Sequence, residues 1–420
     1  MAFKKHAQQY DLVVLGATGK RTCEHITDRF PTDLRWAVAG RSESKLQAVI
    51  DECKKLNPNR VQPAIELADS DSDASVTALV KKTYVLITAV GPYCMYGSGV
   101  FRACAQNGTH YIDCTGEFPW VARMIEEYED AAKASGALMF PQMGLDSAPS
   151  DLCTWALARH VREKLGAQTR DVTIVFHDIK FTPSGGSLAT LLAVFNHFSI
   201  REVQAAGKPY ALSPVPRKPE GARPHESVFN KLFGTRTIQP FGTVTTSFAS
   251  ITDGSEVERT WGLLSSTPSR RDEFYGPNFT WAQYFRAESP LHGFFIHLAL
   301  ALGTFVIACI PPARELIKKF IYQPGQGASK ESTAKERVEY RGIASPDNNG
   351  KTNDKAYCTA VYEGGTYYLT GMLLADGART LLEEDTGLQG GIYTPACLGQ
   401  SYIDRVSDSG FKLEVKTIQV

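Results

Sequence analysis

The chain has 420 residues, of which 43% are hydrophobic and 21% are charged. This ordinary globular balance, at a length sufficient for two domains, excludes a chain that is disordered throughout. Lys+Arg and Asp+Glu both number 45, so no net basic field favours nucleic acid as a partner. We therefore expect a small ligand that is recognised by the shape of a pocket.

The cysteines and the N-terminal residues bear on the compartment. Nine cysteines are scattered without the CxxC or Cys/His spacing of a metal site, and their odd number favours a reducing compartment over a disulfide scaffold. The residues before the first strand lack the apolar stretch of a secretory signal. We expect a cytoplasmic protein with no metal site.

The first 150 residues alternate short apolar strands with helical stretches, a pattern typical of a parallel sheet with crossover helices. We expect strands at residues 12–15, 35–39, 61–67, 84–90, 110–114 and 137–141. Six such strands predict an α/β fold with a doubly wound parallel sheet of the Rossmann type in residues 1–150.

After residue 150 the pattern changes. A helix at residues 150–164 precedes segments in which apolar and polar residues alternate, at 172–181, 241–251, 337–344 and 355–362. Such alternation indicates antiparallel strands with one covered face. We therefore expect a second, α+β domain at residues 151–385.

The first strand leads directly into a glycine turn, in the segment DLVVLGATGKRTCE at residues 11–24. Glycines here let the backbone turn tightly where a diphosphate can lie on the N-terminus of the next helix. The predicted cofactor-binding residues of this turn are Gly16, Thr18 and Gly19. The usual fingerprint has a third glycine three residues after the second, and Thr22 stands at that position.

Arg41 and Ser42 follow the second predicted strand. Arg41 lies 25 residues after Gly16. A carboxylate at this position would bind the 2'-hydroxyl of NAD, whereas a guanidinium with hydroxyls suits a 2'-phosphate. The sequence therefore predicts NADPH as the cofactor.

Gly91, Pro92 and Tyr93 follow the fourth predicted strand, at the edge where open α/β sheets bind ligands. We expect them to face the nicotinamide, with Tyr93 as a candidate proton donor. The alternative is a turn ended by proline with an aromatic plug. Asp146 lies in the segment GLDSAPSD at residues 144–151, which lines an interdomain cleft or forms a capped hinge.

Residues 293–310 form an apolar segment of 18 residues without a charge, about the minimum for a membrane span. Three alternatives stay open: a buried or pocket-lining helix, a helix inserted in a membrane surface, and a true span. His297 and the pair Pro311-Pro312 argue against a clean span.

Taken together, the motifs resemble the saccharopine dehydrogenase-like oxidoreductases, in particular their trans-acting enoyl reductase branch. The resemblance spans nearly the whole chain and includes the following segments in order: LGATG, AGRS, TAVGPYCMYG, HYIDCTGE, GLDSAPSDL, SGGSLATL, PPARELIKKFIYQPGQG and GGIYTPACLG. It implies an NADPH-binding domain, an α+β second domain, and a C-terminal segment at residues 386–420 that packs back against the first domain.

The glycine turn departs from the family pattern, in which GATG is followed by an aromatic residue, Thr, Gly and a basic residue. Here Lys20 follows Gly19 directly, as if three residues were missing. Three residues are close to one helical turn, so the helix can re-form with a rotation of about 60°. The diphosphate contact is then kept, weakened or lost.

The leading hypothesis is an NADPH-dependent enoyl reductase of secondary metabolism that acts on a polyketide- or lipid-like substrate, either a small molecule or carrier-bound. Tyr93 or Asp146 donates the proton. The expected partners are a polyketide synthase and, through residues 293–313, a membrane or lipid surface. The alternative is that the shortened turn has ended NADPH chemistry, leaving an isomerase, a cyclase or a non-catalytic pathway partner.

Overall fold

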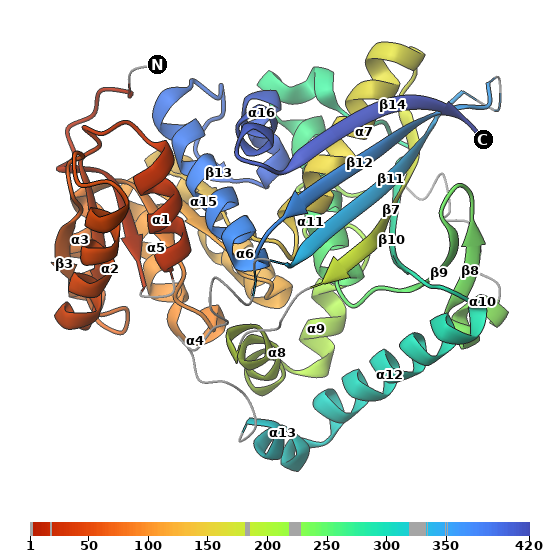
Figure 1. The fold of residues 1–420 in the computed structure, drawn as a ribbon, viewed down its shortest axis with the longest axis horizontal. Coiled ribbons are helices and arrows are strands. Elements are labelled where there is room, and N and C mark those ends of the chain that lie inside the picture. The colour runs from red at the N-terminus through yellow and green to blue at the C-terminus, as the bar shows by residue number, and fades with distance from the viewer. Residues whose placement is uncertain are drawn as a thin grey trace.

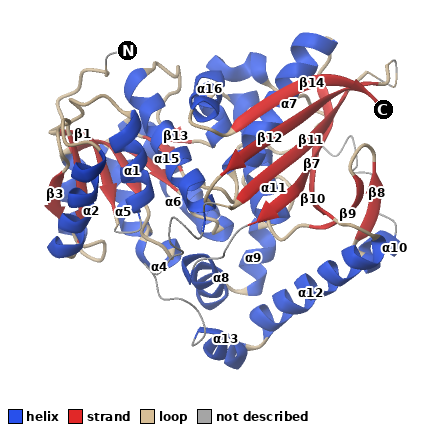
Figure 2. Ribbon diagram, in the orientation of Figure 1, coloured by secondary structure: helices blue, strands red, loops and turns tan. Residues whose placement is uncertain are grey.

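The computed structural model describes residues 3–16, 19–180, 185–217, 228–318, 333, 335–348, 350 and 352–420. In these residues the chain forms two seven-stranded sheets, each covered by helices (Figures 1 and 2). The first sheet belongs mainly to the N-terminal part of the chain and the second to the remainder.

The first sheet has the order β13-β6-β5-β4-β1-β2-β3, and every pair in it is parallel. Its strands are β1 (Tyr10–Leu15), β2 (Trp36–Gly40), β3 (Ala64–Leu67), β4 (Thr83–Thr88), β5 (His110–Asp113), β6 (Leu138–Phe140) and β13 (Gly391–Ile392). The predicted α/β class is confirmed. Six of these strands were expected from apolar runs, because strands covered on both faces need apolar side chains on both.

Helices cover both faces of this sheet, as a doubly wound fold requires. They are α1 (Lys20–Arg29), α2 (Glu43–Leu56), α3 (Asp73–Lys81), α5 (Ser98–Asn107), α6 (Phe118–Ser135) and α15 (Thr366–Glu383), with the single turn α4 (Tyr93–Tyr96) after β4. Although α15 comes late in the chain, it packs against α1, β4 and β5 (Figure 1).

The second sheet has the order β14-β12-β11-β7-β10-β9-β8 and is mixed, since β7 and β10 are parallel and its other pairs are antiparallel. Its strands are β7 (Thr169–Lys180), β8 (Thr235–Ile238), β9 (Gly242–Thr246), β10 (Thr280–Arg286), β11 (Arg337–Pro346), β12 (Asp354–Glu363) and β14 (Lys412–Gln419). The second α+β unit is thus present.

Two groups of helices accompany the second sheet. Long helices α7 (Ala148–Leu165) and α11 (Ser250–Ser266) pack against its strands and against each other. The others are α8 (Gly185–His197), α9 (Ile200–Ala206), α10 (Val228–Phe233), α12 (Pro290–Cys309), α13 (Pro311–Lys318) and α16 (Gln400–Asp408).

The strand expected at residues 241–251 is wrong in its second half. The strand β9 ends at Thr246 and the helix α11 begins at Ser250. Residues 253–264 of α11 are buried on every side of the helix, so the stretch carries no amphipathic pattern that would distinguish a helix from a strand.

The C-terminal residues contribute to both sheets. Strand β13 pairs with β6 at the edge of the first sheet. This pairing is what we expect of a C-terminal segment that packs back against the first domain. After α16, strand β14 pairs with β12 at the edge of the second sheet. The segment from β13 to β14 therefore ties the two units together.

Helix α1 is held in place by a close contact with α15. A Cβ atom at Gly371 would lie 2.8 Å from the backbone C of Arg21 and the backbone N of Thr22. Beside this contact, His25 Nε2 lies 3.1 Å from Asp376 Oδ1. The first turn of α1, which follows the shortened glycine turn, is thus set by the surface of α15.

We predict that Gly371→Ala lowers the melting temperature by several degrees, because the added methyl group collides with the backbone of α1 and such overpacking costs about 1–3 kcal/mol. Gly303→Ala is the matched control. Its Cβ meets nothing within 4 Å in the exposed helix α12, so alanine there should leave stability unchanged or raise it. Equal melting temperatures for the Gly371 variant and the wild type would contradict the contact.

Candidate active site

The candidate site lies at the carboxyl edge of the first sheet. Because the strands are parallel, the segments that follow β1, β2, β4, β5 and β6 all leave the sheet at this edge. The predicted residues Gly16, Gly19, Arg41, Ser42 and 91–93 belong to these segments, and so does Asp146. The structure thus gathers along one edge residues that are up to 130 positions apart.

Both described glycines of the turn after β1 are required by close packing. Gly16 has φ +107°, and a Cβ on it would lie 2.8 Å from Val90 Cγ2 after β4. A Cβ on Gly19 would lie 2.6 Å from Val14 Cγ1. Thr18 lies outside the described residues.

Helix α1 begins at Lys20, immediately after Gly19, and extends for ten residues. The shortened turn therefore still presents a helix N-terminus at the sheet edge, and Gly19 has no side chain that could cap it. Amide groups at such an N-terminus, together with the helix dipole, suit a diphosphate. The residues present fit this part of a dinucleotide.

Arg41 stands at the end of β2 with its side chain 69% exposed, and its Nη1 lies 3.8 Å from Asp71 Oδ2. A pair this long between solvated groups holds the guanidinium only weakly. Next to it, Ser42 Oγ lies 3.2 Å from Ser44 Oγ. A weakly held guanidinium beside two hydroxyls fits a 2'-phosphate.

Tyr93 is buried below the edge rather than exposed at it. Its side chain is 4% exposed, and its hydroxyl donates to the Thr88 carbonyl at 3.0 Å. Burial raises its pKa well above the ordinary value. The ring also lies 3.5 Å from the position that a Cβ on Gly91 would take. This is the geometry of the aromatic plug after Pro92, and the catalytic role of Tyr93 stays a prediction.

Glu117 holds the turn after β4, a role that the sequence analysis did not assign. Its buried carboxylate accepts from Tyr93 N at 2.7 Å and from Cys94 N at 2.8 Å, which caps the turn α4. Burial raises its pKa. The signal was available, because Glu117 ends the motif HYIDCTGE just after a predicted strand.

Asp113, at the end of β5, fixes the segment that follows β6. Its Oδ1 accepts from Thr115 N at 2.8 Å and from Gln142 N at 3.0 Å, and its Oδ2 accepts from the Tyr111 hydroxyl at 2.6 Å. Burial raises the pKa of Asp113 to about 7. The chain that leads to Asp146 is thereby held beside β5.

Asp146 is open to solvent but closely surrounded by protein atoms, and this surrounding raises the pKa of its carboxyl. Oδ2 lies 3.4 Å from the position that a Cβ on Gly116 would take. On the other side, the preceding carbonyl of Leu145 accepts from the Tyr340 hydroxyl of β11 at 3.2 Å. Asp146 therefore stands between the edge of the first sheet and the second sheet.

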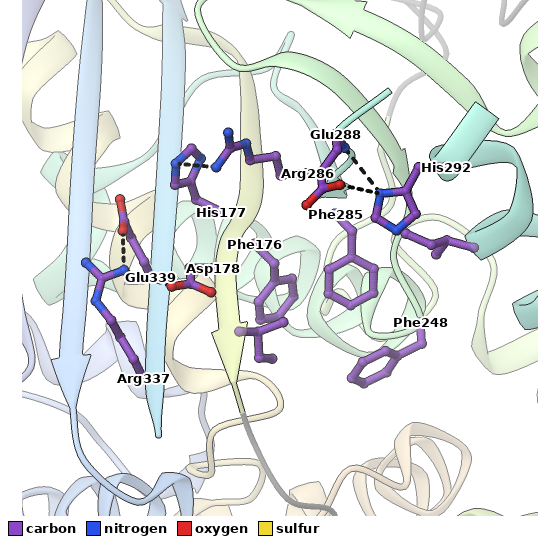
Figure 3. A pocket seen from close by; sticks show the side chains of 12 residues that line it. Phe176, His177, Asp178, Phe248, Phe285, Arg286, Glu288, His292, Arg337 and Glu339 are labelled. Carbon is purple, nitrogen blue, oxygen red and sulfur yellow. Dashed lines mark hydrogen bonds and ion pairs between the residues drawn. The ribbon is translucent and has the colours of Figure 1, made fainter. Parts of the chain in front are cut away.

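A cavity of about 700 Å³ opens at the second sheet, at the ends of β7 and β10 (Figure 3). Its apolar lining includes Phe176, Phe248 and Phe285. The Phe176 ring lies 4.6 Å, centroid to centroid, from the ring of Tyr340. One layer of aromatic side chains thus separates this cavity from the segment that carries Asp146.

The polar wall of the cavity is internally paired. Arg337 Nη1 lies 3.2 Å from Asp178 Oδ2 and 2.7 Å from Glu339 Oε2. Burial lowers the pKa of His177, whose Nε2 lies 3.3 Å from Arg286 Nη1. Figure 3 shows the aromatic rings grouped apart from these charges. The cavity suits an apolar group with a polar end.

We predict that stability decreases as the pH rises from 5 to 8. Asp113 and Asp151 both have a pKa raised to about 7 by burial, against an ordinary value of 3.8. Over most of this range these two carboxyls bind more protons in the folded protein than in the unfolded chain, so raising the pH favours unfolding through them. Thermal unfolding across the range checks this, and Asp151→Asn should flatten the pH dependence; an unchanged slope would contradict it.

Comparison with known proteins agrees with this geometry. Residues 13–139 match the family model of the saccharopine dehydrogenase NADP binding domain. A putative trans-acting enoyl reductase of Mycobacterium tuberculosis is 27% identical, with 97% of each chain covered. A trans-acting enoyl reductase of Mycobacterium bovis is 36% identical over 44% of each chain.

Among solved structures, apo saccharopine dehydrogenase (L-Glu forming) from Saccharomyces cerevisiae has a TM-score of 0.51 at 15% identity, with 97% of this chain and 100% of that chain covered. This likeness concerns the fold. The domain match and the full-length relatives confirm the resemblance drawn from the motifs: residues 13–139 form a saccharopine dehydrogenase-type NADP binding domain, and nearly the whole chain is similar to trans-acting enoyl reductases.

Proposed function

We propose that the protein is an NADPH-dependent enoyl reductase that reduces an activated carbon–carbon double bond in a polyketide- or lipid-like acyl substrate of secondary metabolism. The observation that carries the proposal is the position of Asp146. Its carboxyl, with a raised pKa, stands at the cofactor edge, one aromatic layer from an apolar cavity. The names of the full-length relatives support the same chemistry.

The cofactor is held by residues of the first sheet. The N-terminus of α1, which the turn at Gly16 and Gly19 presents, would hold the diphosphate, and Arg41 with Ser42 would bind the 2'-phosphate. When bound there, NADPH supplies the hydride. Glu117 keeps the turn at 91–93 in place at the nicotinamide end of the edge, through its bonds to Tyr93 N and Cys94 N.

Asp146 supplies the proton. As the double bond is reduced, one new C–H bond forms with the hydride at the carbon distant from the carbonyl, and the second forms at the adjacent carbon with the proton of Asp146. The carboxylate left behind regains a proton from water, to which it is exposed. The raised pKa of Asp146 lies closer to neutral pH than that of an ordinary aspartic acid. A general acid is most efficient when its pKa is near the pH at which the enzyme works.

Tyr93 is the weaker candidate for this role. Its hydroxyl proton is used in the bond to the Thr88 carbonyl, and the side chain is buried. We assign it to holding the end of β4 in place.

The substrate is an enoyl thioester, either a small molecule or an acyl chain bound to a carrier. A trans-acting reductase, the term in the names of the relatives, serves a separate synthase. We therefore propose a polyketide synthase as the source of the carrier-bound chain.

The test is NADPH oxidation with a 2-enoyl thioester. We expect Asp146→Asn to lower kcat about 100-fold or more, the usual loss when a general acid is removed. The wild type should also lose activity as the pH rises through the raised pKa of Asp146, because the carboxyl then loses its proton. The pH–rate profile of the variant should not show this decrease. Asp404→Asn, on the exposed face of α16, is the matched control and should behave as the wild type.

Tyr93→Phe separates the two proton donors. We expect it to retain most of the activity, because the ring still fills its buried site and only the contacts of the hydroxyl with the Thr88 carbonyl and with Cys114 N and Sγ are lost. A large loss in Tyr93→Phe together with full activity in Asp146→Asn would overturn the assignment. No oxidation of NADPH with any enoyl thioester would overturn the proposed reaction.

Arg41 should set the preference between nucleotides. We expect Arg41→Ala to weaken NADPH binding about 10- to 100-fold, the range for a lost hydrogen bond to a charged group, and to leave NADH binding unchanged. Arg271→Ala, also an exposed arginine, is the control. Fluorescence titration with both nucleotides checks this, and an equal loss for NADPH and NADH would contradict the 2'-phosphate contact.

A further inference from the structure

Helix α12 forms an exposed apolar ridge together with α10 and α13. It has 20 residues and a mean hydropathy of 1.9, and only 6% of its apolar window is buried. The reading of residues 293–310 as a buried helix is therefore wrong, although part of the helix lines the cavity. The ridge comprises Val228, Phe229, Leu232, Leu291, Phe295, Leu298, Leu302, Phe305 and Leu316, all exposed. Figure 1 shows α12 along one edge of the molecule, between α10 and α13.

In its middle, helix α12 is exposed on nearly all of its sides and not along a single stripe. From Leu298 to Phe305, a stretch of two turns, every residue except the half-buried Leu300 is exposed, and none is charged. A second copy of the chain would cover one side of such a helix and leave the others in water. A helix that is apolar all round is stable where apolar material surrounds it, as lipid does.

The N-terminal end of α12 is fixed to the folded body. The Thr245 hydroxyl donates to the Gly293 carbonyl at 2.7 Å, and Thr246 Oγ1 lies 2.8 Å from His297 Nδ1. A Cβ on Gly293 would lie 2.7 Å from Thr235 Cγ2. The first two turns of the helix thus lie directly on β8 and β9.

The C-terminal end is fixed as well. Arg314, at the start of α13, donates from Nη1 to the Phe195 carbonyl of α8 at 3.1 Å. The same nitrogen donates to the Ile307 carbonyl at 3.1 Å, which satisfies the end of α12. Because both ends are bound to one body, the helix cannot turn across a bilayer without breaking these contacts.

We propose that the apolar ridge docks the protein on the surface of a phospholipid bilayer, with α12 lying parallel to the membrane plane. Ile296 and His292 of the same helix line the cavity at the second sheet. Docking therefore brings the cavity next to the lipid, so that an acyl chain passes from one to the other with little contact with water. The docking itself requires neither cofactor nor substrate.

The test is flotation of the full chain with phosphatidylcholine vesicles, without nucleotide. The wild type should float, and the triple variant Phe295→Gln, Leu302→Gln, Phe305→Gln should lose at least about tenfold in the bound fraction, since bound fraction follows the apolar area inserted. Those three side chains are 57%, 56% and 58% exposed, so the variant should melt at the wild-type temperature.

The matched control is Leu56→Gln, Val61→Gln, Leu67→Gln, whose side chains are 52%, 51% and 60% exposed on the first domain. It should float as the wild type does. A fluorophore sensitive to polarity on Cys309, the exposed cysteine at the end of α12, should shift to the blue when vesicles are added.

Three results would overturn the proposal. The first is a wild type that does not float with the vesicles. This includes a wild type that forms a dimer in solution, if the triple variant is monomeric. The second is equal flotation of the triple variant and the wild type. The third is resistance to alkaline carbonate extraction from vesicles, which would show a true span. Because the assay contains no NADPH, its failure is independent of failure of the proposed reductase activity.

Discussion

The buried carboxyl of Asp151 joins the parts of the chain on which the site depends. Its Oδ1 accepts from the Thr260 hydroxyl of α11 at 2.7 Å, and its Oδ2 accepts from Ala396 N, just beyond β13, at 2.9 Å. The carboxyl itself lies in the first turn of α7, the helix that connects the two units. One side chain thus holds the edge of the first sheet, the helices of the second and the C-terminal segment together. Asp146 lies five residues before it, so this anchor also limits where the proposed acid can move.

Two surfaces of different character meet near Asp146. On one side the parallel sheet offers a helix N-terminus and an exposed guanidinium, both suited to the phosphates of a dinucleotide. On the other side lies an aromatic cavity whose charged groups are already paired with one another. Asp146 therefore lies between a surface suited to a charged cofactor and a cavity suited to an apolar group, with the Phe176 and Tyr340 rings between it and the cavity. The exposed helix α12 extends the apolar side to the surface of the molecule.

The sequence was sufficient for six of the seven strands of the first sheet and only partly for the site. Strands β1, β2, β4 and β6 are buried and mostly apolar, and strands β1 to β6 alternate with helices, a pattern that few other folds share. The same logic failed at α11, where burial on every side removes the periodicity. Composition could not decide the environment of α12, because a buried helix and a lipid-facing helix need the same apolar residues. The partner of the Tyr93 hydroxyl and the network around Asp113 depend on contacts across the sheet, which the local sequence does not encode.

We infer that the shortened glycine turn still binds NADPH, since α1 begins directly after Gly19 and α15 fixes its first turn. Titration of the wild-type chain with NADPH, followed by nucleotide fluorescence and by thermal shift, tests this most directly. We expect saturable binding in the micromolar range, with NADH binding more weakly. No response at millimolar NADPH, from a protein that is folded by thermal unfolding, would contradict it.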